Sequence, residues 1–261
     1  WTLKVARDAS CVMALENGWA WWASSGRQAH FQCIVDAIDK RQLNAQYQHI
    51  IHSTAEVKSW LAQADPISPI NVCAANITYF QEVVGDNWIR VGDAALAPDP
   101  LSGQGVFEAI ASAFAAVPTI NTLLHSPDNR EWALQFYAQR CAERFHSIAR
   151  TGRDFYRMEK RYCDRPFWQP RQHWPDHTPA HPEPSKEDPR IELRPAVIDQ
   201  FIQAREVVVT ADHPRGVLAL NNVPLVSYLH SLKAKDPALP FTASAEQLNA
   251  AQHWLDQRGL L

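Results

Sequence analysis

The sequence lacks cysteine pairs and a nucleotide-binding glycine fingerprint, and each gap excludes a class of protein or site. Its nine glycines nowhere form the G-x-G-x-x-G pattern of a dinucleotide-binding βαβ unit. Its five cysteines form no C-x-x-C pair, which argues against a zinc site and against a disulfide scaffold. We therefore expect free thiols in a reducing compartment, with the cytoplasm as the default location.

Long apolar runs and a strong excess of one charge are also missing. We find no apolar run approaching the roughly 20 residues that span a bilayer and no secretory signal, so no membrane partner is expected. The net charge of −3 gives no reason to expect nucleic acid as a partner. With 46% hydrophobic and 20% charged residues, the chain is typical of a folded protein with one large or two modest domains.

The first third of the chain has the pattern of an antiparallel meander. Short β-branched or aromatic segments alternate with turn residues and predict strands at 1–6, 11–15, 18–23 and 29–36. Asn17-Gly18 is a hairpin signal. Ser53-Thr54-Ala55-Glu56 matches a capping box and predicts a helix to residue 64, followed by a strand over 72–84.

The remainder is predicted to be helical first and mixed later. Apolar periodicity predicts a helix over 106–124, which Pro118 could kink, and a long helix over 130–162 capped by Asp128 or Asn129. Seven prolines between residues 166 and 189 predict an extended linker. A helix over 195–204, a hairpin of 206–210 with 217–220, and two further helices complete the prediction.

Residues 91–109, which read VGDAALAPDPLSGQGVFEA, are the most informative segment. The apolar stretch 88–91 ends in Gly92-Asp93, a proline-rich loop follows, and residues 102–105 lead into an apolar helical run. Glycines let backbone N–H groups approach a ligand closely, and a helix N-terminus favours negative charge. The order predicts a site for a polar, partly anionic ring system, with a tight turn and no ligand as the alternative.

The stretch GDAALAPDPLSGQG resembles the second FAD-binding motif of the flavoprotein monooxygenase and flavin-dependent halogenase superfamily. The resemblance implies FAD as the cofactor, Asp93 as acceptor of hydrogen bonds from ribityl hydroxyls, and Pro100 as the residue that shapes the loop near the reactive edge of the ring. It also implies that backbone N–H groups around Gly103 to Gly105 face the N1/O2 edge of the flavin. The implied cofactor-binding residues are Gly92, Asp93, Pro100, Ser102, Gly103, Gln104 and Gly105.

A tryptophan-rich strand offers candidate substrate-lining residues. Trp19 and Trp21 match the W-x-W-x-I-P signature of the halogenases, but Ala23-Ser24 replaces Ile-Pro. That segment lies by the halogenase substrate tunnel and is thought to discourage monooxygenation, so the departure favours hydroxylation. Core aromatics on one strand face are the equal alternative for both tryptophans. No catalytic residue is identified, and the acid–base candidates, each with a structural alternative, are His30, His49, His52 and Glu108.

The tail FYRMEKRYCDRPFWQPRQ and the unit after it resemble, more loosely, the flavoprotein monooxygenases of quinohemoprotein amine dehydrogenase maturation. The implied function is an FAD-dependent monooxygenase that uses NAD(P)H and O₂ to hydroxylate an aromatic substrate, with a peptidyl tryptophan in tryptophylquinone biogenesis as one candidate. A flavin-dependent halogenase and a non-catalytic scaffold remain alternatives. Because the superfamily binds the ADP half of FAD through a G-x-G-x-x-G unit, the resemblance implies an N-terminal half, which a separate chain could supply.

The implied fold is α/β, with α+β character in this portion. The expected parts are a substrate-domain sheet and helix (1–85), an FAD-contacting strand-loop-helix (86–125), a long helical segment (126–165), a proline-rich linker (166–195) and a small C-terminal α+β domain (196–261). The basic series from Arg150 to Arg161 is interpreted as a solvated helix face, with a docking face as the alternative. No metal site is expected at His173, His177 and His181, because prolines between them forbid a helix.

Overall fold

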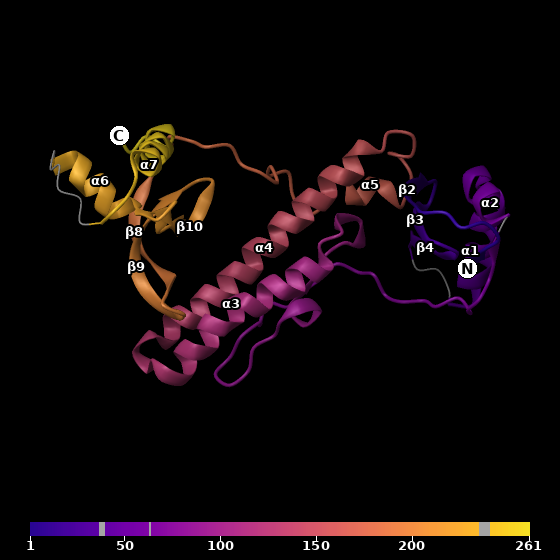
Figure 1. Cartoon of the computed structure of the whole chain (residues 1–261), viewed down its shortest axis with the longest axis horizontal. Coiled ribbons are helices and arrows are strands. Elements are labelled where there is room, and N and C mark those ends of the chain that lie inside the picture. The colour runs from indigo at the N-terminus through magenta and orange to yellow at the C-terminus, as the bar shows by residue number, and fades with distance from the viewer. Residues whose placement is uncertain (37–39, 63, 235–240) are drawn as a thin grey trace. The chain divides into compact units, whose positions relative to one another are not determined.

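The computed structural model describes residues 1–36, 40–62, 64–234 and 241–261. Its contacts divide the chain into two compact units, Trp1–Asn76 with Gly152–His177 and Ile77–Thr151 with Thr178–Leu261, and each unit is described by itself. Helices combine with antiparallel sheets in the described residues (Figure 1), which confirms the expected mixed α/β fold class.

The first unit is built on a five-stranded sheet with the strand order β2-β3-β4-β1-β5. The predicted meander is confirmed by β2, β3 and β4, which pair as antiparallel neighbours. The turn between β2 and β3 lies at Glu16-Asn17, because Gly18 already pairs with Leu15. The strands of this sheet are β1 (Thr2–Leu3), β2 (Ala9–Leu15), β3 (Gly18–Ser25), β4 (Gln28–Val35) and β5 (Ala64–Asp65).

Two short helices, α1 (Leu43–Ser53) and α2 (Ala55–Leu61), pack against this sheet after the 3-10 turn η1 (Lys40–Gln42). Their buried side chains join those of the sheet in one core, which contains Trp22, Phe31, Ile51 and Val57. The capping-box prediction is wrong, because Ser53 ends α1 and Thr54, the N-cap of α2, makes no side-chain capping hydrogen bond.

The second unit contains the glycine motif and two long helices. The short strands β6 (Thr78–Tyr79) and β7 (Leu96–Ala97) pair near the motif, and the 3-10 turns η2 (Gly92–Ala94) and η3 (Pro100–Ser102) lie within it. Helix α3 (Gly105–His125), the 3-10 turn η4 (Pro127–Asn129) and helix α4 (Arg130–Met158) follow, and α3 runs beside α4 (Figure 1). Both helix predictions are confirmed. The strand predicted over 72–84 is wrong for most of its length, because most of its side chains are exposed and no sheet buries them.

A small antiparallel sheet with the order β10-β9-β8 completes the second unit, with α6 and α7 packed on it. The helix predicted over 195–204 is wrong. Asp199 and Gln200 form the tight turn between β8 and β9, with positive φ angles of 46° and 69°. A right-handed α-helix requires negative φ angles, so these residues are not helical. A hairpin follows as predicted, but its turn lies at residues 211–212, and the predicted turn residues 213–216 belong to its second strand, β10 (His213–Val217). The two later helices are confirmed. The elements are β8 (Arg190–Ile198), β9 (Phe201–Thr210), β10 (His213–Val217), β11 (Ala219–Leu220), β12 (Val223–Pro224), α6 (Leu225–Ala234) and α7 (Ala245–Gln257).

Helix α3 is long and apolar enough to cross a membrane by length and composition. Its most apolar 18-residue window has a mean hydropathy of 1.4 and is 33% buried. The expectation that no apolar stretch reaches this length is therefore wrong. The core helices of globular proteins pass the same test, so this finding alone does not place α3 in a bilayer.

Candidate functional site

The Gly92-Asp93 turn is held against the second turn of α3. The Gly92 N–H donates to Ser112 Oγ over 2.9 Å, and a Cβ on Gly92 would lie 3.3 Å from the Ala109 Cβ. The φ angle of Gly92 is +56°, a conformation that glycine adopts without strain. The Asp93 side chain is exposed beside this fixed turn, so its carboxylate is placed where it can accept hydrogen bonds from a ligand.

The proline-rich loop is ordered by its own hydrogen bonds. The buried Asp99 carboxylate accepts the Leu101 N–H over 2.8 Å, and Ser102 Oγ donates to the Asp99 carbonyl over 2.7 Å. The Gly103 and Gln104 N–H groups donate to Pro100 O and Ser102 Oγ. The donors that an approaching anion meets are therefore the N–H groups of residues 105–107, because the first N–H groups of a helix have no acceptor within it, whereas the Glu108 N–H donates to the Gln104 carbonyl.

The surface around the two loop glycines is open. A Cβ placed on Gly103 or Gly105 would meet no atom within 4 Å. The protein itself would therefore leave room for a side chain at both positions. At Gly103 the φ angle of +63° still favours glycine. An open, amide-lined bend at a helix N-terminus fits the edge of a planar, partly anionic ring, so these residues fit the FAD that the motif implies.

A buried charge cluster lies directly behind this loop. Glu108, in the first turn of α3, has 1% of its side chain exposed and accepts a hydrogen bond from Arg144 Nε over 2.6 Å. Arg144 Nη2 also donates to Gln104 Oε1 over 2.8 Å, and Arg140 Nη1 lies 3.5 Å from Glu108 Oε1. Sequence reasoning missed both arginines. Their spacing of four residues, which places them on one side of α4, was the available signal.

The four acid–base candidates belong to different units of the structure. Glu108 is engaged by two arginines, whereas His30, His49 and His52 are exposed residues of the first unit. The structure therefore singles out none of them as a proton donor or acceptor for a substrate.

Trp19 and Trp21 share a face of β3, and Trp19 is part of an aromatic cluster. Its Nε1 donates to the Tyr156 hydroxyl over 3.3 Å. The Tyr156 ring packs against Phe167 and against Trp168, the first residue of α5 (Trp168–Arg171). Trp19 is 4% exposed and Trp21 is half-buried. Packing thus accounts for Trp19, and a substrate-lining role for both residues stays a prediction.

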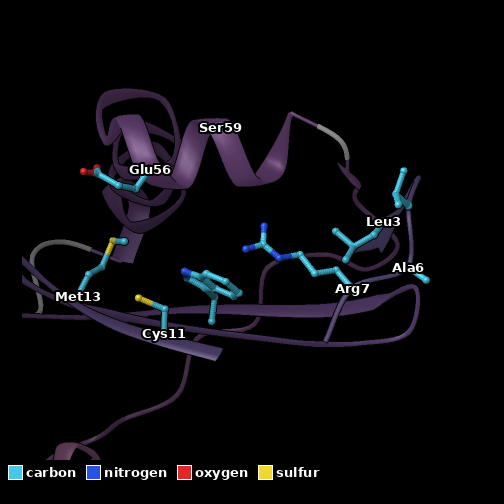
Figure 2. Close-up of a pocket in the computed structure, with 9 residues that line it drawn as sticks. Leu3, Ala6, Arg7, Cys11, Met13, Glu56 and Ser59 are labelled. Carbon is cyan, nitrogen blue, oxygen red and sulfur yellow. The ribbon is translucent and has the colours of Figure 1, made fainter. Parts of the chain in front are cut away.

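A cavity of about 540 Å³ lies on the opposite face of the same sheet, beside Trp22 and α2 (Figure 2). Arg7 reaches into it with its guanidinium carbon 6.0 Å from the centre of the Trp22 ring. The Cys11 and Met13 sulfur atoms and the Glu56 carboxylate complete its polar and polarisable lining. Trp19 and Trp21 do not line this cavity.

Cysteine chemistry and metal binding find little support in the described residues. Burial raises the pKa of the Cys33 thiol to about 12 and also raises the pKa of Cys141, so neither thiol is a ready nucleophile. His173 and His177 lie with their ring centres 6.1 Å apart, but no group of three potential metal ligands occurs in the part of the chain that the structure describes.

Comparisons with known proteins point to flavin enzymes. The chain is 36% identical to the solved structure of the peptidyl tryptophan dihydroxylase QhpG, essential for tryptophylquinone cofactor biogenesis, with a TM-score of 0.83 over 100% of this chain and 62% of that one. It is 26% identical to LodB of Marinomonas mediterranea, provisionally described as an FAD-dependent oxidoreductase, over 61% of this chain and 43% of that protein. No family model matches.

Two halogenases share the fold. The flavin-dependent halogenase CmlS superimposes with a TM-score of 0.66 and 15% sequence identity over 97% of this chain. The myxobacterial chondrochloren halogenase CndH superimposes with a TM-score of 0.52 and 21% sequence identity over 63% of this chain. The chain spans less than two thirds of the length of each of these relatives. In sequence and in fold the chain is thus similar to the flavoprotein monooxygenase and flavin-dependent halogenase superfamily, which confirms the resemblance predicted from the Gly92–Gly105 motif.

Proposed function

We propose that this chain forms the substrate-domain and flavin-contacting part of an FAD-dependent monooxygenase that hydroxylates a peptidyl tryptophan. The observation that carries the proposal is the 36% identity to a peptidyl tryptophan dihydroxylase over the whole of this chain. The open glycine bend and the exposed Asp93 support it independently. Bound FAD supplies the activation of O₂ and the transfer of one oxygen atom to an electron-rich ring.

The residues of this chain bind and orient that cofactor. Asp93 would accept hydrogen bonds from ribityl hydroxyls, and a charged acceptor would make these bonds strong. The first turn of α3 would present N–H groups and a partial positive charge to the anionic edge of the ring. Because Ser112 and Asp99 hold both parts of the motif from within, the site is organised before the ligand arrives.

We further propose that NAD(P)H is the reductant and that the enzyme works in the cytoplasm. The five free cysteines support a reducing compartment. The halogenase alternative has the fold of CmlS and CndH in its favour, but Ala23-Ser24 replaces the Ile-Pro of the halogenase signature.

An exposed apolar face on α3 supports a further part of the proposal, a nucleotide-binding segment that covers this helix. Apolar side chains that recur every three or four positions share this face and leave much of their surface in solvent: Val106 77%, Phe107 63%, Ile110 54%, Phe114 75%, Val117 49%, Ile120 38% and Leu124 69%. A contiguous apolar patch of this kind marks an interface. Because the face starts at the flavin loop, we assign it to the G-x-G-x-x-G segment that holds the ADP half of FAD.

The test uses the full-length protein that contains this chain. We expect the purified protein to show flavin absorbance or to acquire it on addition of FAD, and Asp93→Ala to weaken FAD binding at least tenfold. Asp164→Ala removes an exposed carboxylate outside the motif and serves as the matched control. Products from a tryptophan-containing substrate polypeptide, analysed by mass spectrometry, separate added oxygen from added halogen. A protein that neither contains nor binds FAD would refute the proposal.

A further inference from the structure

The charge cluster behind the glycine loop holds more positive than negative charge. Glu108 faces two guanidinium groups, those of Arg144 at 2.6 Å and Arg140 at 3.5 Å, so one positive charge is left over in this cluster. The side chains of Arg140 and Arg144 are 16% and 29% exposed, and that of Glu108 is 1% exposed. Partial burial weakens solvent screening, so the excess charge acts over a longer range than it would on an open surface.

The cluster is also incompletely satisfied. Glu108 Oε1 and Arg140 Nη1 are both buried and neither has a hydrogen-bond partner among the described residues. A buried carboxylate kept only for stability is expected to have its oxygens fully hydrogen-bonded, since burial of a charge is costly. An arrangement with unused hydrogen-bonding capacity is more typical of a functional site than of a stabilising ion pair.

Arg144 connects this cluster to the loop. It donates to the side chain of Gln104, the N-cap residue of α3, and to Glu108 one turn later. The Glu108 N–H in turn donates to the Gln104 carbonyl over 2.8 Å. The guanidinium from α4 therefore fixes both the position of the bend and the sign of the charge next to it.

We propose that Arg144 is a positioning residue that makes this bend bind reduced flavin more tightly than oxidised flavin, an inference that rests on the proposed function. Two electrons and one proton, supplied by a hydride donor, convert the neutral oxidised ring into an anion whose charge lies at its N1/O2 edge. The surplus positive charge of the cluster and the N-terminus of α3 act in the same direction and favour that anion. Glu108 opposes them and limits the effect.

The test compares substitutions that break the same ion pair but change the charge in opposite directions. Arg144→Gln removes one positive charge, and we expect the ratio of reduced to oxidised FAD affinity to fall about tenfold, a drop of about 30 mV in midpoint potential for this two-electron couple. Glu108→Gln removes the negative charge, and we expect the potential to rise. Arg144→Lys should recover most of the wild-type potential, because it keeps the charge.

The matched control is Arg215→Gln. Arg215 lies on β10 and pairs with Glu143, a residue of α4, the helix that also carries Arg144. Full-length holoprotein is equilibrated with a redox dye of known potential during slow reduction, and the potential is read from the two absorbances. A purely structural role predicts equal potentials, or shifts of the same sign, for Arg144→Gln and Glu108→Gln, and either result would overturn the inference. If Arg144→Gln does not fold, the midpoint potential of Glu108→Gln tests the inference by itself: a rise supports it, and an unchanged or lower potential overturns it. Wild-type protein that binds no FAD would instead refute the proposed function.

Discussion

Replacing Gly105 by alanine separates a glycine kept for folding from one kept for a ligand. Gly105 is the first residue of α3, its φ is not in the left-handed region, and a Cβ there would meet no atom within 4 Å. The folded chain therefore accommodates alanine without strain. Because alanine loses less conformational entropy than glycine on entering a helix, we expect Gly105→Ala to stabilise the apoprotein by about 0.5 kcal/mol.

The same methyl group projects into the space where a ring would pack. Overpacking a close contact typically costs about 1–3 kcal/mol, so we expect FAD affinity to fall by about tenfold or more. The assays are urea denaturation of the apoprotein and titration with FAD followed by flavin fluorescence. Gly26→Ala is the control, because Gly26 has a φ of +57° and open space around it but lies in a turn of the first unit. It should cost about 1 kcal/mol of stability and leave FAD binding unchanged. Unchanged FAD affinity in Gly105→Ala would refute the assignment of this bend to the flavin.

Two further predictions concern stability and thiol reactivity. Burial raises the pKa of Asp212, but hydrogen bonds from Arg258 and Thr210 outweigh burial and hold this pKa below its usual value. The carboxylate therefore stabilises the fold at pH values above its unfolded-state pKa of about 4. This stabilisation is lost as the pH falls through the lowered pKa of the folded state. Arg258→Met removes the guanidinium partner of this buried carboxylate and leaves it the Thr210 hydroxyl and His213, whose Nδ1 lies 3.0 Å away. The substitution should cost about 3 kcal/mol at pH 7 and less at pH 3, and a pH-independent difference between the urea midpoints of variant and wild type would contradict this. With its pKa near 12, Cys33 should resist iodoacetamide at pH 8 long after the exposed Cys73 is modified, as peptide mass spectrometry can measure, and equal rates would show that the thiol is not buried.

Local signals in the sequence predicted the parts of the fold that local chemistry determines. The meander of β2 to β4 follows from alternating residues and a two-residue turn, and α3 and α4 follow from uninterrupted helical periodicity. The hairpin of β8 and β9 was missed because its turn uses Asp199 and Gln200 with positive φ, where a glycine or asparagine would have given the signal. Pro195, the first residue of the helix predicted over 195–204, lies within the strand β8.

The candidate site divides in the same way. The Gly92-Asp93 turn and the Gly103–Gly105 bend are contiguous motifs, so the sequence predicted them. Arg144 is 36 residues from Glu108 and 40 from Gln104, and a single sequence contains no local pattern that joins them. The basic series on α4 was interpreted as a solvated face, yet Arg153 is 2% exposed and donates to the Asp176 carbonyl. Such long-range ion pairs follow from the packing of helices, which periodicity alone does not specify.

The aromatic cluster at the end of α4 has a consequence for an enzyme that oxidises indoles. A catalyst of this kind endangers its own tryptophans, and Trp19, Trp22 and Trp168 are sheltered at 4%, 9% and 3% exposure. Among the tryptophans whose exposure the structure describes, Trp88 and Trp174 are the most exposed, at 41% and 42%. If the proposed chemistry is right, self-inflicted oxidation during prolonged turnover should accumulate at these two rings first, as a mass gain of one oxygen atom in their peptides, whereas damage concentrated at the sheltered rings would argue against it.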